Sequence, residues 1–296
     1  MANTKQLRTR MKSVKNLQKI IKALEIVSTV KLQKLRGVIV TYREFMKSFL
    51  EVLNVVMDEI NIFDFDKNKR NPNWRRLLIV VTTDKWLCWG VNSRIFKRME
   101  KNYAQAKDNV DIFVVWRKWL EYFIRNWWNV VWSLIVSDKV LLAEINPLSA
   151  FIKKALEEKT YSKIKVYFNF FKSTMDQVLT RFKLYPLDRE SFEDFLNNVW
   201  IEVEESNTTK KFLMIEPDTK TYKHDFLQLL IRTIIFSAVV NNKTTEYAAR
   251  MVAMKNAKDN CNDLLVQLNL MYNKTRQLKI TQEITEIVSA KWAIDA

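Results

Sequence analysis

The chain has 296 residues, 48% of them hydrophobic and 12% aromatic, which excludes a disordered tail and is enough for a sizeable core. Its net charge of +16 predicts an acidic partner of one of three kinds: nucleic acid, an anionic membrane surface or an acidic protein face. The only two cysteines, Cys88 and Cys261, are far apart and indicate neither a disulfide framework nor a metal site.

The N-terminal region, residues 1–70, is predicted to form a long amphipathic helix. Apolar residues recur at spacings of three and four from Leu7 to Val30, and no proline interrupts them. The first 36 residues hold ten Lys or Arg against the single acid Glu25, as a helix that neutralises phosphates would. Because this segment lacks aromatic residues that stack on bases, a solvated face or a contact with acidic protein loops explains the charge as well.

The middle of the chain, residues 71–217, shows the alternation of short apolar strands and amphipathic helices that is typical of an α/β domain with a mainly parallel sheet. It also contains all four prolines. The predicted strands are residues 77–83, 110–116, 129–137, 163–171 and 212–216, and the predicted helices are residues 92–106 and 148–158.

The C-terminal region, residues 218–296, is predicted to form a second long helix. Residues 222–289 contain neither proline nor glycine, and apolar residues follow a mostly heptad-like pattern from Tyr247 to Tyr272. Two such helices at opposite ends of one chain hide their apolar stripes most simply by pairing. We therefore expect an antiparallel coiled coil that carries a Rossmann-like α/β insert, with a length on the order of 90 Å for about 60 residues.

The sequence predicts no membrane span. The first residues are too polar for the apolar core of a secretion signal. The longest apolar-rich run, Phe226 to Val240, is interrupted by Gln228 and Arg232 and is shorter than the roughly 20 residues that span a bilayer. We expect a soluble or peripheral protein in a reducing compartment.

No catalytic, cofactor-binding or metal-binding motif is found. His224, the only histidine, is interpreted as a helix-surface residue, because a general base would need a partnered acid and a pocket. Exposed helix or strand faces also explain the acidic pairs Glu204 with Glu205 and Glu283 with Glu286 better than acid/base chemistry does. A hydrolase or transferase that uses the α/β domain is a third hypothesis, which saturating nucleotide binding would support.

Three collinear segments resemble the gamma subunit of F-type ATP synthases: MKSVKNLQKIIKALEIVSTVKLQKLR, TTDK-LC-G-NSRI, and the run from EYAARM to TEIVSA. The resemblance implies a non-catalytic rotor that couples proton flow through the membrane sector to ATP synthesis or hydrolysis by rotation. It implies the alpha, beta and epsilon subunits and the c-ring as partners, no cofactor, and a peripheral place on the cytoplasmic face of the cell membrane. A basic coiled-coil nucleic-acid-binding protein is the alternative.

The resemblance also implies which residues contact the ring of alpha and beta subunits. Charge-assisted and polar hydrogen bonds suit a shaft that turns against three partners better than deep apolar contacts do. No residue is expected to be catalytic or to bind a metal. The residues at the family's contact positions are Leu24, Lys85, Cys88, Arg250, Arg276, Gln277, Thr281 and Glu283.

Tryptophan and glycine occur in unusual numbers, ten and two, although glycine normally makes up about 7% of a sequence. Trp86 and Trp89 stand in a predicted turn where the resembled motif has glycine, and Trp116 and Trp119 replace glycines of a second pattern. We hypothesise that the gene uses UGA for glycine and that the printed sequence reads this codon as tryptophan.

Overall fold

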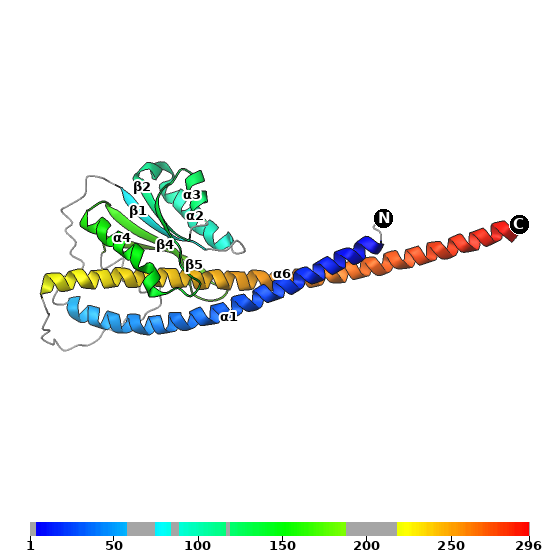
Figure 1. The fold of residues 1–296 in the computed structure, drawn as a ribbon, viewed down its shortest axis with the longest axis horizontal. Helices are drawn as coiled ribbons and strands as arrows, with labels where there is room; N and C mark the ends of the chain where they lie inside the picture. Colours follow the sequence, from blue (N-terminus) through cyan, green and yellow to red (C-terminus); the bar gives the residue numbers. More distant parts are fainter. Residues whose placement is uncertain (1–3, 58–74, 84–88, 117–118, 188–217, 296) are drawn as a thin grey trace. The chain divides into compact units, whose positions relative to one another are not determined.

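The computed structural model describes residues 4–57, 75–83, 89–116, 119–187 and 218–295 (Figure 1). Their contacts divide the chain into two compact units. Unit 1 comprises residues 1–30 and 250–296, and unit 2 comprises residues 31–249. The domain boundaries predicted at residues 70 and 217 follow secondary structure instead and stay a prediction. The strand predicted at residues 212–216 lies outside the described residues.

Both predicted long helices are present. Helix α1 runs over Thr4–Met57 and helix α6 over Thr219–Asp295, and each contributes residues to both units. Neither helix contains a proline, so nothing in the sequence removes a backbone donor from their hydrogen-bond ladders. Among the helices of the described residues, none has the length and apolar character needed to cross a bilayer.

Unit 1 is a pair of helices held by one apolar stripe from each partner. Polar contacts flank the stripe: the Gln18 amide donates to Asn262, and the Lys258 ammonium lies 2.8 Å from a Glu25 carboxylate oxygen. The spacing of the stripe is the one predicted from the sequence, which confirms the pairing of the two ends. The buried side chains of the stripe are Leu7, Val14 and Ile21 of α1 and Met254, Cys261, Leu265 and Leu268 of α6.

Unit 2 contains a five-stranded sheet in the order β3-β2-β1-β4-β5. Strand β1 is parallel to β2 and β4, and β2 is parallel to β3, whereas β4 and β5 are antiparallel. The prediction of a mainly parallel sheet is therefore confirmed, but β5 was not predicted. The strands are β1 (Arg76–Val81), β2 (Val110–Val115), β3 (Asn129–Leu134), β4 (Lys163–Phe171) and β5 (Gln177–Tyr185).

Short helices connect the strands and cover the sheet. Every residue of β2 is buried, as expected for a parallel strand with both faces covered. One apolar cluster joins Ile95 and Met99 of the first connection to Ile112 and Val114 of β2 and to Phe123. The connecting helices are α2 (Trp89–Tyr103), η2 (Ala104–Asn109), α3 (Leu120–Arg125), η4 (Leu142–Ile145) and α4 (Asn146–Glu157).

Candidate functional site

Four of the predicted contact residues lie on an exposed part of α6 in unit 1. Every side chain from residue 276 to 292 is exposed, including apolar ones such as Ile284 and Ile287. The polar groups form local contacts: the Thr281 hydroxyl donates to the Gln277 carbonyl oxygen, and Lys279 lies 3.6 Å from Glu283. The four contact residues on this segment are Arg276, Gln277, Thr281 and Glu283.

The other predicted contact residues have different surroundings. Leu24 is half-buried against the apolar stripe of unit 1. Arg250 is only 3% exposed, so its side chain lies inside the described chain. Lys85 and Cys88 lie outside the described residues. The structure thus brings four of the eight residues together on one helical segment, and their predicted roles stay predictions.

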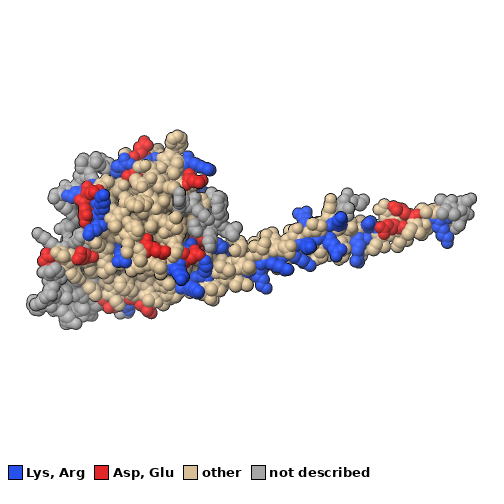
Figure 2. All heavy atoms as spheres, in the orientation of Figure 1, with Lys and Arg blue, Asp and Glu red and all other residues tan. Residues whose placement is uncertain are grey.

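A basic surface covers the N-terminal part of α1 in unit 1. The residues Lys5, Arg8, Lys12, Lys15 and Lys19 are all exposed. Figure 2 shows Lys and Arg side chains along the paired helices, with acidic side chains few among them. The apolar stripe occupies another face of α1, so these exposed charges offer a surface for an acidic partner.

Helix α6 is attached to the sheet of unit 2 by buried polar side chains. The Asn242 amide donates to the Thr82 carbonyl oxygen at 2.6 Å, and its own oxygen accepts the Asn169 backbone N–H at 3.1 Å. The Thr245 hydroxyl donates to the Asn169 carbonyl oxygen at 3.3 Å. Asn242 and Thr245 are fully buried, so these bonds connect α6 with the end of β1 and with β4 in a place that water does not reach.

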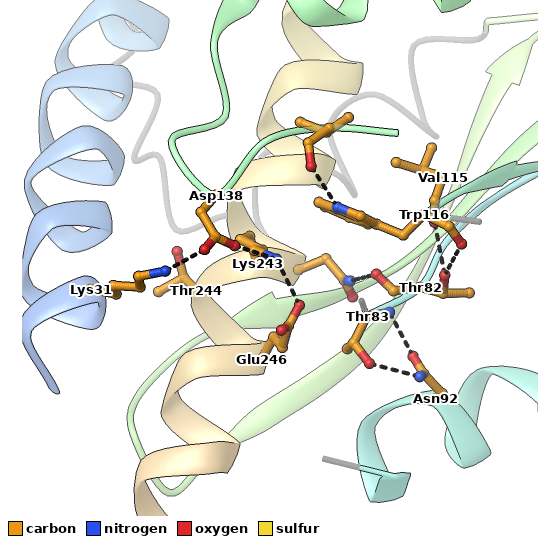
Figure 3. A network of polar contacts seen from close by, with 12 residues as sticks. Lys31, Thr82, Thr83, Asn92, Val115, Trp116, Asp138, Lys243, Thr244 and Glu246 are labelled. Carbon is orange, nitrogen blue, oxygen red and sulfur yellow. Dashed lines mark hydrogen bonds and ion pairs between the residues drawn. The ribbon is translucent and has the colours of Figure 1, made fainter. Parts of the chain in front are cut away.

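A second attachment in unit 2 is ionic (Figure 3). Asp138, in the segment between β3 and η4, pairs through one carboxylate oxygen with Lys31 of α1. Its other oxygen lies 3.1 Å from the Lys243 ammonium of α6, which also lies 3.2 Å from Glu246. The side chains of Lys243 and Glu246 are 1% and 0% exposed, whereas Lys31 and Asp138 are half-buried. One carboxylate therefore joins three segments of the chain.

The surroundings of Asp138 favour its charged form. Burial by itself raises the pKa of this carboxyl group. Hydrogen bonds from Lys31 and Tyr247, together with the positive charge of Lys243, outweigh burial and hold the pKa of Asp138 well below its usual range. The lowered pKa keeps Asp138 ionised at neutral pH, as its pairs with Lys31 and Lys243 require.

The polar run from Asn241 to Glu246 is the functional feature that the sequence analysis missed. Its residues are all buried, although Asn, Lys and Glu are normally exposed. The sequence did contain a signal for this run. Residues 241–246 are six consecutive polar residues that follow an apolar run ending at Val240 and precede Tyr247, and none of them is a proline or a glycine. Such a run inside a long helix indicates a buried partner that supplies hydrogen bonds.

No three His, Cys, Asp or Glu side chains within the described ranges come together as a metal site would require. The side chain of His224 lies outside what the structure describes, as do Glu204 and Glu205. What the geometry provides is a helix pair with an exposed, basic surface in unit 1 and, within unit 2, two long helices attached to an α/β domain by polar contacts.

A sequence model of the ATP synthase family matches residues 3–294. The chain belongs to this family. A curated relative, the ATP synthase gamma chain of Opitutus terrae, is 32% identical over 295 residues and covers 99% of both sequences. The predicted family membership is thereby confirmed from one end of the chain to the other.

Solved structures confirm the predicted fold of this family member. A chain of the mitochondrial ATP synthase of Euglena gracilis, described with the F1 part and the c-ring, aligns with a TM-score of 0.66 at 18% identity, over 98% of this chain and 94% of that one. The central stalk and c-ring structure from Tetrahymena thermophila aligns with a TM-score of 0.58 at 22% identity, over 80% and 99%. At these identities the likeness establishes the fold alone.

Proposed function

We propose that the chain is the rotating central shaft of a proton-driven ATP synthase. Unit 1 turns inside a ring of alpha and beta subunits, and unit 2 meets the epsilon subunit and the c-ring. Rotation driven by proton flow then changes the conformation of each beta subunit in turn, and ATP hydrolysis drives the reverse rotation. The full-length relative named as a gamma chain supports this proposal. The family resemblance implies that the catalytic sites lie on the beta subunits.

The exposed end of α6 is the observation that carries the proposal. From residue 276 to 292 no side chain is buried, although the segment includes Leu278, Ile280, Ile284 and Ile287. Most of the stability of a helix in water comes from packing of an apolar face, so a helix segment that packs on nothing is marginal. A ring of partner subunits around this segment would cover its apolar side chains.

The predicted contact residues fit such a ring. Arg276, Gln277, Thr281 and Glu283 present charged and polar groups that can bond with one partner and be released as the shaft turns. Leu24 belongs to the same unit and sits beside its apolar stripe. Lys85, Cys88 and Arg250 are retained as contact residues on the strength of the family resemblance alone.

We place the assembled protein on the cytoplasmic face of the cell membrane, held there through the c-ring. The basic surface of unit 1 suits acidic loops of beta subunits. No described helix could span the bilayer, so membrane attachment requires partner subunits or anionic lipid.

The test is reconstitution of the chain with alpha and beta subunits from the same organism. We expect assembly, ATP hydrolysis that requires the chain, and ATP-driven rotation of a bead attached to unit 2. The double variant Gln277→Ala with Thr281→Ala should lower the hydrolysis rate severalfold. Gln267→Ala is the matched control, because Gln267 is also an exposed glutamine of α6 in unit 1. A chain that neither assembles with the ring nor rotates in it contradicts the proposal.

The nucleic-acid hypothesis rests on the same basic surface and is tested separately. A helix that binds phosphates gives duplex DNA or RNA affinity that falls linearly with the logarithm of salt concentration. We expect binding to the alpha and beta subunits to be stronger than binding to either nucleic acid at physiological salt. The reverse order would favour a nucleic-acid-binding protein, and saturating nucleotide binding by the chain alone would favour an enzyme.

A further inference from the structure

The ionic cluster of Lys31, Asp138, Lys243 and Glu246 lies at a particular point in the chain. Lys31 is the first residue of unit 2 on α1, and Glu246 precedes the last residue of unit 2 on α6 by only three positions. Asp138 belongs to the α/β domain and pairs with both lysines (Figure 3). The α/β domain is therefore tied to both long helices close to the point where they leave unit 2.

Burial of these charges is difficult to explain by stability alone. Removing an ion pair from water costs several kcal/mol per ion, and apolar residues of similar volume often stabilise as well or better. Apolar packing of α1 on α6 is already present in unit 2, where Phe49 stacks on Phe226 and Tyr42 packs on Phe236. A buried polar group is better suited to selecting one register among several apolar packings.

The contacts of Asp138 are suited to fixing such a register. Its two oxygens pair with cations from two different helices, so a rotation or a slip of either helix breaks at least one pair. The Lys243 ammonium is held in addition by Glu246 and lies 5.0 Å from the centre of the Trp116 ring. A displaced Lys243 would become a buried charge without its carboxylates, which is strongly unfavourable.

We propose that Asp138 is a positioning residue that locks α1, α6 and the α/β domain in one rotational register, so that they turn as one body. The inference rests on the proposed rotor function, since register matters only if torque passes between the units. Without the lock, the helices could twist against the α/β domain under load. ATP would then be hydrolysed without moving the matching number of protons.

The variant Asp138→Asn tests the lock with little change of shape. It removes both ion pairs of Asp138 but leaves Lys243 paired with Glu246, so no buried cation is left without a carboxylate. Asp176→Asn is the matched control, because Asp176 is a carboxylate of unit 2 that pairs only at the surface, with Lys172 at 3.5 Å. Both variants remove one negative charge from the same unit.

Complexes with each variant are placed in lipid vesicles, and ATP hydrolysis and ATP-driven proton pumping are measured. With Asp138→Asn we expect hydrolysis near that of the unaltered complex and severalfold less pumping per ATP. Equal pumping per ATP in Asp138→Asn and unaltered complexes overturns the proposal, and so does an equal loss with Asp176→Asn. Failure of the unaltered complex to couple hydrolysis to pumping would count against the rotor function itself.

A second measurement does not depend on the complex. Spin labels at the exposed residues Val40 of α1 and Leu229 of α6, with both cysteines replaced by serine, report the distance between the two helices within unit 2. We expect Asp138→Asn to broaden or shift this distance, a slip of one helical turn being about 5.4 Å. An unchanged distance distribution would mean that the cluster does not set the register.

Two tryptophans carry a second inference from a different observation, the backbone conformation. Trp116 and Trp127 have φ angles of 74° and 62°, in the left-handed region. This region costs an L-residue about 1–2 kcal/mol and is uncommon for bulky side chains. Only two other described residues of the chain, Val140 and Lys159, adopt it, and both glycines lie elsewhere.

The surroundings of Trp127 are those of a helix C-terminal glycine. Helix α3 ends at Arg125, the Trp127 N–H donates to the Ile124 carbonyl oxygen at 3.1 Å, and the Trp128 N–H donates to the Phe123 carbonyl oxygen at 3.0 Å. This pair of bonds defines a Schellman motif, in which the left-handed position is usually glycine. The Trp127 side chain is 87% exposed, so its packing does little to offset the strain.

We infer that the native protein has glycine at positions 116 and 127, as expected if UGA codons for glycine were read as tryptophan. Burial of Trp116 with its indole N–H donating to the Val136 carbonyl oxygen shows that the fold can also hold the larger side chain. A glycine at 116 would remove the contact between Lys243 and the Trp116 ring. It would leave the pairs of Asp138 with Lys31 and Lys243 in place, and the register proposal depends on those pairs.

Peptide mass spectrometry of the protein from its native cells decides this inference. Trypsin releases residues 108–117, which contain position 116, and residues 126–139, which contain positions 127, 128 and 132. We expect masses that fit glycine at 116 and 127. Tryptophan masses at these two positions would overturn the inference. The peptide of residues 140–153 contains no tryptophan, so its mass identifies the protein whichever residue the UGA codon encodes.

Discussion

Helix α6 has two kinds of surroundings along its length. In unit 1 it buries one narrow stripe at helical spacing and exposes its other faces. In unit 2, from residue 230 to 249, none of its side chains is exposed, and polar residues are buried together with apolar ones. The same backbone thus serves as half of a helix pair in one unit and as a core element in the other. The spacing of apolar residues in the sequence reveals only the helix-pair role in unit 1.

The difference in surroundings predicts a difference in how each unit is stabilised. The apolar contacts of unit 1 are many and separate, so their contributions should be nearly additive when they are far apart. The buried bonds of unit 2 share atoms: the Asn242 oxygen accepts from both the backbone and the side chain of Asn169. Loss of one member of such a network affects its neighbours.

The largest effect is expected from Asn242→Ala in unit 2. It removes the partner of the Thr82 carbonyl oxygen and of the Asn169 N–H, and each buried polar group left unpaired costs about 1–3 kcal/mol. We expect a loss of about 3–5 kcal/mol in the free energy of unfolding of unit 2. Hydrogen exchange of β1 and β4 measures it. The control Asn262→Ala, at an exposed bond in unit 1, should change little.

A smaller effect is expected from Leu268→Ala in unit 1. Leu268 is 3% exposed in the apolar stripe, and truncating a buried leucine costs about 2–3 kcal/mol at a site that can partly close. The loss of hydrogen-exchange protection should be confined to residues of unit 1. Leu270→Ala, at an exposed leucine of the same helix, is the control. Equal losses from both variants would show that the stripe does not hold the pair.

Trp127→Gly should produce a gain in stability of up to about 1 kcal/mol, because glycine adopts the left-handed region without strain. Thermal unfolding of the recombinant chain measures it. Trp132→Gly is the comparison, since Trp132 is also exposed but lies within β3, where glycine costs about 0.5–1 kcal/mol. A loss at both positions would indicate that the Trp127 indole stabilises the fold after all.

The smallest effect is expected in the pH dependence of unit 2 stability. The pKa of Asp138 is lower in the folded protein than its ordinary value of 3.8 in the unfolded chain. The ionised carboxylate therefore contributes its full share to the free energy of unfolding above pH 3.8, and this share is lost as the pH falls toward the pKa of the folded state. The groups that face it are Lys31, Lys243 and Tyr247. Acid unfolding curves of Asp138→Asn should fall less steeply below about pH 4. Parallel curves for the variant and the unaltered protein would contradict this linkage.

Most of the fold could be predicted from the sequence, because its signals are local. Strands β1, β2 and β4 read as apolar runs, and α1 shows its stripe directly. Strand β5 was missed even though Thr180, Phe182 and Leu184 alternate with more exposed neighbours, since charged residues interrupt its apolar pattern. An antiparallel edge strand gives this weaker signal.

The candidate site was less predictable. Arg276, Gln277 and Thr281 were identified through a family resemblance and not through any property of their own spacing. The buried run containing Asn242 and Lys243 could not be placed, because its burial depends on the sheet packing against that side of α6. The left-handed backbone at Trp127 likewise depends on how α3 ends, and a tryptophan in the sequence does not predict a left-handed residue.

In the sequence, the α/β domain lies between the two long helices, and this order has a consequence for folding. Gln18 and Asn262 are 244 residues apart in the sequence, yet their side chains meet in unit 1. Closing so long a loop in an unfolded chain is entropically unfavourable and slow. Once unit 2 has folded, the bond between Tyr42 and Thr233 already holds α1 beside α6. The helix pair of unit 1 should therefore form last. Pairing should begin where the two helices leave unit 2 and continue along α1 toward its N-terminus.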